Sequence, residues 1–304
     1  MESITGALGP LFLLILLGAV LGNWRWPSDT FWPQMERLIY FVLFPAMLVG
    51  TLATADVAQV PVGRLALVLL GAMAFFGLLL WRLRGWLRLA PAAFTSVFQG
   101  AVRFNTYVGV AGAAALHGSL GATTAAVAVA LMVPVVNVMC VASFVGAGTL
   151  GSTSLGKSVM ALVKNPLILA CLVGIGLNVS GIGLPGWSEA TVGLLGRAAL
   201  PLGLVAVGVA LRPAALLRID RGVLATNSVK LLLMPAFVLI LTWILQLDPV
   251  SRDVALLFAA LPTATSAYIL ARQLGGDAEL MAAIITGQTL LAMLTLPLWL
   301  KLIS

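Results

Sequence analysis

Charged residues are scarce in this sequence, and their scarcity excludes most soluble folds. Only 9% of the 304 residues are Asp, Glu, Lys or Arg, whereas a soluble globular domain carries roughly 25%. Hydrophobic residues make up 61% of the chain, and the mean hydropathy is +1.11. This composition is typical of a chain that is surrounded by lipid. The sequence therefore predicts an all-α polytopic protein of the cell membrane.

Residues that carry catalysis or bind metals are also few. His117 is the only histidine, and the two cysteines, Cys140 and Cys171, lie in apolar segments without the spacing of metal ligands. The motifs GxSxG, HExxH and the P-loop do not occur. We therefore predict neither an enzyme nor a protein with a metal or cofactor. We expect His117 to be a loop residue with no acid nearby.

The formal net charge of +7 does not indicate a nucleic-acid-binding protein, because the basic residues are dispersed through short loops and form no stripe. Most of them follow the odd-numbered membrane spans counted below. Lysine and arginine concentrate in the cytoplasmic loops of membrane proteins. The pattern predicts that both termini are extracytoplasmic and that the central loop is cytoplasmic.

Apolar runs divide the chain into ten candidate spans, because roughly 20 mostly apolar residues cross a bilayer as a helix. The longest connection, residues 147–165, combines a flexible turn (GSTSLGK) with an expected short interfacial helix (SVMALVK). The candidate spans are residues 4–22, 35–53, 62–81, 92–116, 121–146, 166–180, 190–211, 223–245, 254–274 and 280–300.

Two pairs of matching features indicate an internal repeat. Pro45 in FPAML and Pro201 in LPLGLVAVGVAL lie 156 positions apart, and we expect them to kink spans two and seven. Asn105 and Pro262, which lie in two interrupted spans, are 157 positions apart. The alternative explanation is coincidence, since proline is common in membrane helices.

The common offset predicts a first five-helix repeat at residues 1–146 and a second at residues 166–304, joined by the cytoplasmic loop 147–165. Because each half holds an odd number of spans, the second half must be inverted in the membrane. Inverted repeats with interrupted helices at matching places are typical of secondary transporters, whose binding site lies near the midplane.

Ionisable residues inside the spans point to an anion. No carboxylate lies in the middle of a span, so the commonest signature of a proton relay or a sodium site is missing. Arg103 has no acid of its own, and its anionic partner is predicted to be a substrate. Alternatively, Arg103 extends to the interface or binds carbonyls freed by a helix break. Lys230 lies nearer the start of its span, and we expect it to extend to the interface.

Two stretches, residues 99–109 and 261–277, place polar side chains or a helix breaker where a spanning helix should be apolar. Such groups are costly in a bilayer unless protein or trapped water satisfies them. We expect the two stretches to line one cavity that is positive and free of acids; hydrogen bonding between helices is the alternative. The candidate substrate-binding residues are Arg103, Asn105, Thr106, Asn137, Thr263, Thr265 and Ser266, and the expected helix breaks involve Phe104, Asn105 and Pro262.

Several motifs in order along the chain resemble the auxin efflux carrier family of membrane transporters. They are FPAML, RFNTYVG, KNPLILACLVGIGLN, LPLGLVAVGVAL and LPTATSAYILARQLGGD. The resemblance implies a homodimer whose ten helices form two inverted repeats. It also implies that broken helices four and nine cross, as in bile-acid symporters and sodium–proton antiporters. Spans one, two, six and seven would form a scaffold beside a transport domain. Bacterial members are often described as malonate or organic-acid permeases.

The resemblance assigns two residues to the crossover. Asn105 matches the asparagine in helix four, and Pro262 matches the proline in helix nine. Plant carriers usually have proline directly before that asparagine, whereas this chain has Phe104, so helix four is expected to be broken less sharply or by solvation of residues 103–105. The long regulatory loop of many plant members is absent.

Together these observations predict a secondary transporter of a small organic anion, such as a dicarboxylate or an auxin-like acid, that works by alternating access around a crossover at the midplane. The expected partners are the substrate, the lipid bilayer and a second copy of the chain. The alternative is a membrane sensor or scaffold that binds a ligand without transporting it. The residues do not identify the substrate or the coupling ion.

Overall fold

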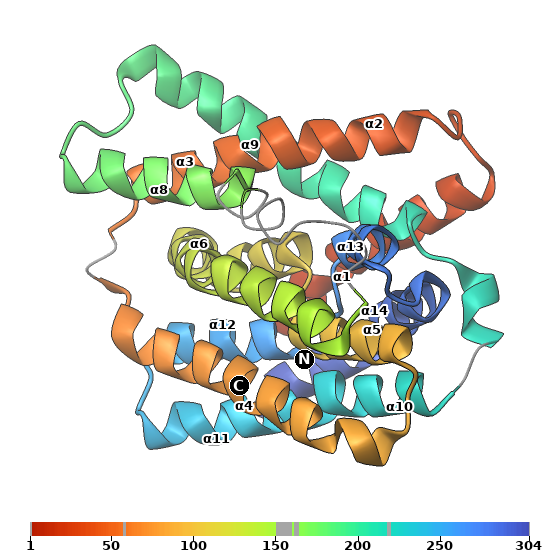
Figure 1. Ribbon diagram of the computed structural model, residues 1–304. Coiled ribbons are helices and arrows are strands. Elements are labelled where there is room, and N and C mark those ends of the chain that lie inside the picture. Colours follow the sequence, from red (N-terminus) through yellow and green to blue (C-terminus); the bar gives the residue numbers. More distant parts are fainter. Residues whose placement is uncertain (1, 57–58, 150–159, 161–163, 218–219, 304) are drawn as a thin grey trace.

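The computed structural model describes the chain except residues 1, 57–58, 150–159, 161–163, 218–219 and 304. All regular elements in the described part are helices (Figure 1). The interfacial helix expected within residues 158–164 lies almost wholly outside the described residues.

The helices follow one another with short connections. Their bounds are α1 Glu2–Asn23, α2 Phe31–Leu38, η1 Ile39–Leu43, α3 Phe44–Ala53, α4 Val62–Leu87, α5 Pro91–Val102, α6 Thr106–Ala147, α8 Pro166–Val179, α9 Gly186–Val209, η3 Pro213–Leu217, α10 Arg221–Ser228, η4 Val229–Leu233, α11 Met234–Ile244, α12 Pro249–Ala260, α13 Ser266–Leu274 and α14 Ala278–Lys301.

The chain is a polytopic membrane protein. Within the described residues, seven helical segments are long and apolar enough to cross a bilayer. One of them, Pro91–Ala147, covers two of the ten expected spans, and Pro166–Val179 is a shorter apolar helix. All ten expected spans fall on helices, so between seven and ten helices cross the membrane.

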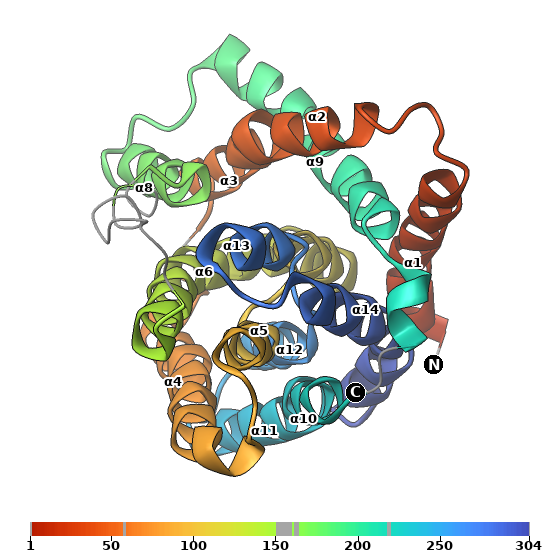
Figure 2. The same ribbon diagram turned by 45° about the vertical axis from the view of Figure 1, so that its right-hand side comes forward.

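The helices form two groups. Helices α1, α2, α3, α8 and α9 lie together on one side, and α4, α5, α6 and α10 to α14 lie together on the other (Figures 1 and 2). The broken helices α5–α6 and α12–α13 belong to the second group (Figure 2), where α12 packs against α6 and α14.

Helix α1 crosses α9 with almost no space between the two backbones. A Cβ atom added at Gly208 would lie 1.8 Å from the Ile15 carbonyl oxygen, and one at Gly18 would lie 2.0 Å from that of Val205. Small residues allow such close approach between membrane helices, where packing rather than water exclusion drives association. Glycine is therefore required on both sides of this crossing.

Two prolines follow widened helical turns. Pro45 lies two residues after the π-helix η1, and Pro235 lies two residues after the π-helix η4. Proline has no N–H and its ring displaces the carbonyl of the residue four positions earlier. For Pro235 that residue is Leu231, whose freed carbonyl oxygen accepts a hydrogen bond of 2.8 Å from the Trp299 indole. The expected second kink, Pro201, lies inside α9.

His117 lies at a connection between two helical segments, as expected, but the expectation that it has no acid nearby was wrong. Helix α6 is interrupted at His117 and Gly118, whose backbone angles are not helical, so two helical segments meet there at a kink. Its Nε2 lies 3.0 Å from Oδ2 of Asp253, in the first turns of α12, and Arg252 Nε donates to the other carboxylate oxygen at 3.0 Å. The sequence could not show this pair, because its members are 136 positions apart.

Replacing Gly208 by alanine is expected to push α1 away from α9. The added methyl group meets backbone, which cannot rotate aside, so we expect a destabilisation of about 1–3 kcal/mol, typical of overpacking. Thermal unfolding in detergent measures it. Gly9→Ala on α1 is the matched control, because nothing lies within 4 Å of the added atom. Equal melting temperatures for the two variants would contradict the requirement for glycine at the crossing.

Candidate functional site

Two spanning helices are interrupted in mid-course. Helix α5 ends at Val102 and α6 begins at Thr106; α12 ends at Ala260 and α13 begins at Ser266. Arg103 and Leu261, which follow α5 and α12, both have extended backbone angles. Each interruption leaves several N–H and C=O groups without a partner in their own helix.

The two breaks contact each other directly through their backbones. Asn105 N donates to the Pro262 carbonyl oxygen at 2.8 Å. Thr263 Oγ1 donates to the Gly100 carbonyl oxygen, near the end of α5, at 2.7 Å. Four residues of this junction, Gly100, Asn105, Pro262 and Thr263, are buried. In the bilayer, groups freed by broken helices must find partners within the protein, and here each break supplies partners for the other.

Gln288 of α14 completes this junction. Its Oε1 accepts from Thr263 N at 2.8 Å and lies 2.7 Å from Thr263 Oγ1, whose single proton is shared between Gln288 Oε1 and the Gly100 carbonyl oxygen. Its Nε2 donates to the Gly100 carbonyl oxygen at 3.0 Å. The Thr263 hydroxyl therefore holds the two breaks together and does not line the cavity described below. The sequence gives little indication of this role, because a single glutamine in a span does not show which groups it faces.

Asn105 caps the second half of the first broken helix. Its Oδ1 accepts from Tyr107 N at 3.1 Å and Val108 N at 3.3 Å. The side chain is buried, and Nδ2 has no hydrogen-bond partner in the structure. The preceding Phe104 is buried too, and its ring lies 5.6 Å from that of Phe258 on α12. The break is therefore fixed by an N-cap and by packing, without proline.

A cavity of about 1430 Å³ opens beside the two breaks. We call it the Arg103 cavity. The polar and charged residues that line it are Glu36, Arg37, Tyr40, Arg103, Tyr107, Asn137, Asn165, Thr265, Ser266 and Gln273. The structure thus brings together four of the predicted site residues, Arg103, Asn137, Thr265 and Ser266. The other three, Asn105, Thr106 and Thr263, do not line it.

Arg103 is half-buried in this cavity and is held by neutral groups. Its Nη1 donates to Asn137 Oδ1 at 3.1 Å and its Nη2 donates to Ser266 Oγ at 3.3 Å. Among the described residues, no carboxylate forms an ion pair with it. The guanidinium is therefore fixed in direction while its charge is not neutralised by protein.

The local helix ends add to the positive potential. The cavity wall includes Thr265 and Ser266, where α13 begins, and Tyr107, in the first turn of α6. Each helix N-terminus carries a partial positive charge, equivalent to roughly half an elementary charge. Two helix N-termini and one arginine thus face the same space, an arrangement that favours an anion.

The cavity is not free of acids, contrary to expectation. Glu36 and Arg37 of α2 both line it, whereas Arg103 lies at the break. Glu36 escaped the search because it lies near the start of its span, where an acid resembles a residue of the adjoining loop. No mid-span carboxylate faces Arg103 within the described residues, so the expectation holds only for the inner part of the cavity.

Sequence reasoning missed the aromatic and amide residues of the wall. The chain contains three tyrosines, and Tyr40 and Tyr107 both line the cavity, as does Asn165. Asn165 Oδ1 also caps α8, accepting from Leu167 N at 2.9 Å. The signals were present, because tyrosine is unusual in the middle of a span and Asn165 stands in the KNPL motif.

Lys230 does not extend to the interface, and that expectation was wrong. Its side chain is 1% exposed, in the π-helix η4, and its Nζ donates to Met234 Sδ at 3.7 Å. A thioether is a weak acceptor, and no acid pairs with Lys230 among the described residues. Neighbouring helices cover this part of the span, which hydropathy along one segment cannot reveal.

Removing the buried amine should therefore cost little stability. Replacing a buried charged group by an apolar group of similar shape is often neutral or stabilising, so Lys230→Met is expected to keep or raise the melting temperature. Lys164→Met, at an exposed position, serves as the control for a general effect of methionine. A marked loss of stability confined to Lys230→Met would show that the ammonium has a partner of structural importance.

Loss of the Asn105 cap should weaken the crossover. Asn105→Ala leaves two N–H groups of α6 without their acceptor, and we expect a cost of about 0.5–2 kcal/mol. Asn105→Ser keeps a capping oxygen and should recover most of the stability. Thermal unfolding of both variants in detergent measures the difference; equal losses would mean that the cap contributes nothing.

Comparison with known proteins shows similarity to membrane transporters. A family model described as "Membrane transport protein" matches residues 149–300. A protein of Rhizobium meliloti (strain 1021) named "Putative malonate transporter" is 27% identical over 309 residues, which cover 97% of this chain and 94% of that protein. An "Uncharacterized transporter" of Methanothermobacter thermautotrophicus is 28% identical over 134 residues, 44% of each protein. The resemblance seen in the motifs is confirmed: the chain belongs to the membrane transport protein family, which includes the auxin efflux carriers and is a family of transporters, not of enzymes.

Proposed function

We propose that this protein is a secondary transporter of a small organic anion, with malonate or a similar dicarboxylate as the first candidate substrate. The name of the full-length relative from Rhizobium meliloti supports that choice. The transported anion would occupy the Arg103 cavity and reach each side of the membrane in turn. No cofactor or metal is part of the proposal.

The observation that carries the proposal is the state of Arg103. Its guanidinium lines the cavity and is held by two neutral acceptors rather than by an acid. Arginine binds carboxylates through two parallel N–H donors, which gives both strength and orientation. A carboxylate that enters this cavity therefore finds an unneutralised fork beside two helix N-termini.

The surrounding residues suggest how such an anion would be oriented. The bonds from Arg103 to Asn137 and Ser266 are 3.1 and 3.3 Å long, toward the weak end of the usual range. An arriving carboxylate would replace one or both of them, and the released Ser266 hydroxyl and Asn137 amide would then donate to the substrate. Thr265 lines the same wall and offers a further donor.

A second carboxylate group would also find donors in the Arg103 cavity. Arg37, Tyr40 and Asn165 line other parts of its wall. A dicarboxylate would thus use the fixed Arg103 for one end and this second set for the other. A monocarboxylate would leave one set unused and would bind more weakly.

We further propose the complete ten-span topology, with inverted repeats at residues 1–146 and 166–304 and a cytoplasmic connection at residues 147–165. Both termini would be extracytoplasmic in the cell membrane, and two copies would form a homodimer. The mutual contact of the two breaks, which lie at equivalent places of the halves, supports the repeat. The positive-inside bias supports the orientation.

The role of Asn105 in this mechanism would be indirect. Its oxygen is already committed to the N-terminus of α6, so it would hold the break in place while Arg103 binds the anion. Pro262 and Thr263 would act in the same way from the second break. Pro45 and Pro201 would shape the helices of the group opposite, against which the crossover moves.

Removing the Arg103 guanidinium should weaken recognition of the carboxylate. In proteoliposomes we expect Arg103→Gln to lower malonate uptake and to weaken malonate binding about ten- to a hundredfold, because a hydrogen bond to a charged group is worth roughly 1.5–3 kcal/mol. Arg103→Lys keeps the charge but loses the fork, and should fall between. Arg64→Gln is the control, because Arg64 bonds the Gln246 carbonyl elsewhere in the structure.

Two measurements separate transport from mere binding. Malonate should raise the melting temperature of the wild-type protein but not of Arg103→Gln, since a ligand stabilises in proportion to its occupancy. Uptake of labelled malonate must accompany that shift. Binding without uptake would favour a membrane sensor or scaffold, and unimpaired uptake by Arg103→Gln would overturn the site assignment.

A further inference from the structure

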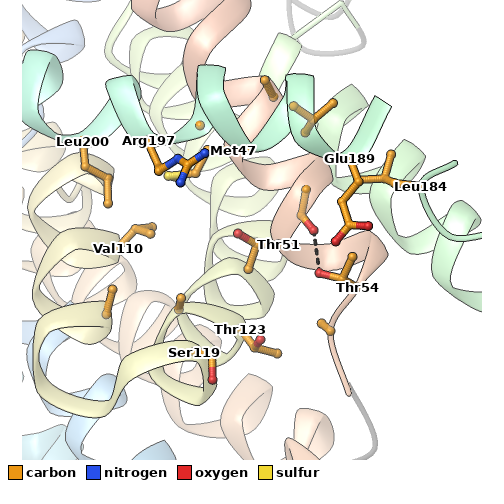
Figure 3. Close-up of a pocket in the computed structure, with 18 of the residues that line it drawn as sticks. Met47, Thr51, Thr54, Val110, Ser119, Thr123, Leu184, Glu189, Arg197 and Leu200 are labelled. Atoms are coloured by element: carbon orange, nitrogen blue, oxygen red, sulfur yellow. Dashed lines mark hydrogen bonds between the residues drawn. The ribbon is translucent and has the colours of Figure 1, made fainter. Parts of the chain in front are cut away.

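A second cavity of about 1070 Å³ lies in the same molecule and shares no lining residue with the Arg103 cavity. We call it the Arg197 cavity (Figure 3). Helices α3 and α9 border it on one side and α6 on the other (Figure 3). Arg197 and Glu189 of α9 line it together with Thr51 and Thr123, and none of these was a predicted site residue.

The two cavities occupy opposite ends of the same helices. Along η1 and α3, Tyr40 and Phe41 line the Arg103 cavity, whereas Ala46 and Met47 line the Arg197 cavity. Along α9 the order is reversed, as expected for an antiparallel neighbour. There Leu200 and Pro201 line the Arg197 cavity, and Ala206 and Val207 line the Arg103 cavity.

Helix α6 shows the same change within one turn. Tyr107 lines the Arg103 cavity and Val110 lines the Arg197 cavity. On all three elements, the face that lines one cavity gives way to the face that lines the other within a few residues. This boundary lies at Phe44, at Tyr107 and at Gly203. A turn of α-helix rises about 5.4 Å, so the material between the two cavities is of the order of one side-chain layer.

Tyr107 contacts both of the other residues, Phe44 and Gly203. The rings of Phe44 and Tyr107 pack edge to face, with centroids 4.8 Å apart and planes at 90°. Phe44 is fully buried. A Cβ atom added at Gly203 would lie 2.9 Å from Cγ and Cδ1 of Tyr107, so the tyrosine ring lies directly against the backbone of α9. We call Phe44, Tyr107 and Gly203 the aromatic partition.

We propose that the Arg197 cavity is the opposite mouth of the substrate path and that the aromatic partition is the gate that separates it from the Arg103 cavity. This inference rests on the proposed transport function. It adds the route of the anion and the residues that block it. The gate forms part of the wall of the Arg103 cavity, because Tyr107 belongs to the aromatic partition and also lines that cavity.

The position of Tyr107 explains how the gate would follow the site. Its backbone N–H donates to Asn105 Oδ1, so its ring is carried on the first turn after the helix break. Phe44 and Gly203 belong to the other group of helices, on α3 and α9. Sliding of one group against the other therefore separates Tyr107 from both partners at once. Because Gly203 has no side chain, the Tyr107 ring would meet no obstacle on α9 as it moves.

Labelling of introduced cysteines tests the gate without any substrate. Cys140 and Cys171 are first replaced by alanine. A single cysteine is then placed in each cavity, as Ala142→Cys in the Arg103 cavity and Ser119→Cys in the Arg197 cavity. Proteoliposomes are treated with a membrane-impermeant thiosulfonate from one side or the other. In labelling pulses that are short compared with the transport cycle, we expect each cysteine to react from one side only, and the two to react from opposite sides.

Opening the partition should make both positions reactive from both sides. We expect this of Tyr107→Ala and, as an independent second variant, of Phe44→Ala, while Tyr107→Phe keeps the ring and the one-sided pattern. Two-sided labelling with the partition intact, labelling of both positions from the same side, or one-sided labelling in both alanine variants would overturn the proposal. Monodisperse elution and a melting transition identify the folded variants to be scored.

Gly203→Ala provides a test that leaves both rings in place. Its methyl group would meet the Tyr107 ring at 2.9 Å, so we expect at least a fivefold fall in uptake. Gly71→Ala, with nothing within 4 Å of the added atom, should transport normally. Equal uptake by the two variants would contradict the gate. If wild-type protein shows one-sided labelling but no malonate uptake, the proposed substrate fails and the partition stands.

Discussion

The structure depends on a requirement of the bilayer, that broken helices satisfy their backbone groups within the protein. Two spans are interrupted here, and neither could exist alone, because each exposes donors and acceptors that lipid cannot satisfy. The hydrogen bond from Asn105 N to the Pro262 carbonyl oxygen joins them, and Gln288 satisfies much of what is left. The breaks are therefore stable only as a pair, which explains why they lie side by side at the centre of the fold.

The same pairing produces the chemistry of the site. Interrupting a helix creates a new N-terminus in mid-membrane, and two interruptions that meet create two of them within one small volume. Arg103, the first residue after α5, is placed at this point by the break itself. The position of the Arg103 charge and the helix ends both follow from the interruptions, so the contact that holds the two breaks together also makes the cavity suitable for an anion.

Much of this arrangement could be predicted from the sequence because its causes are local. The composition indicated the membrane, and the positions of Asn105, Pro262 and Arg103 indicated where helices would be interrupted. The residues that face one another across the fold could not be predicted from the sequence. Glu36 enters the cavity, Lys230 is enclosed and Asp253 contacts His117 only because helices distant in sequence pack together. Asn105 and Thr263 were assigned to the cavity because the sequence shows that they are polar residues within spans. It does not show the backbone groups with which they form hydrogen bonds.

The asymmetry between the breaks also has a physical reason. Pro262 has no N–H, so at the junction it can only accept, and the residue facing it must donate. Asn105 donates its N–H to that carbonyl oxygen and uses its side chain to cap α6, and a proline at position 105 could do neither. At position 104 a proline would keep the break but remove the ring that packs against Phe258. Phenylalanine at position 104 does not break a helix as proline does, but it adds apolar packing between α12 and the first break. The N-cap of Asn105 then maintains the interruption that proline would otherwise impose.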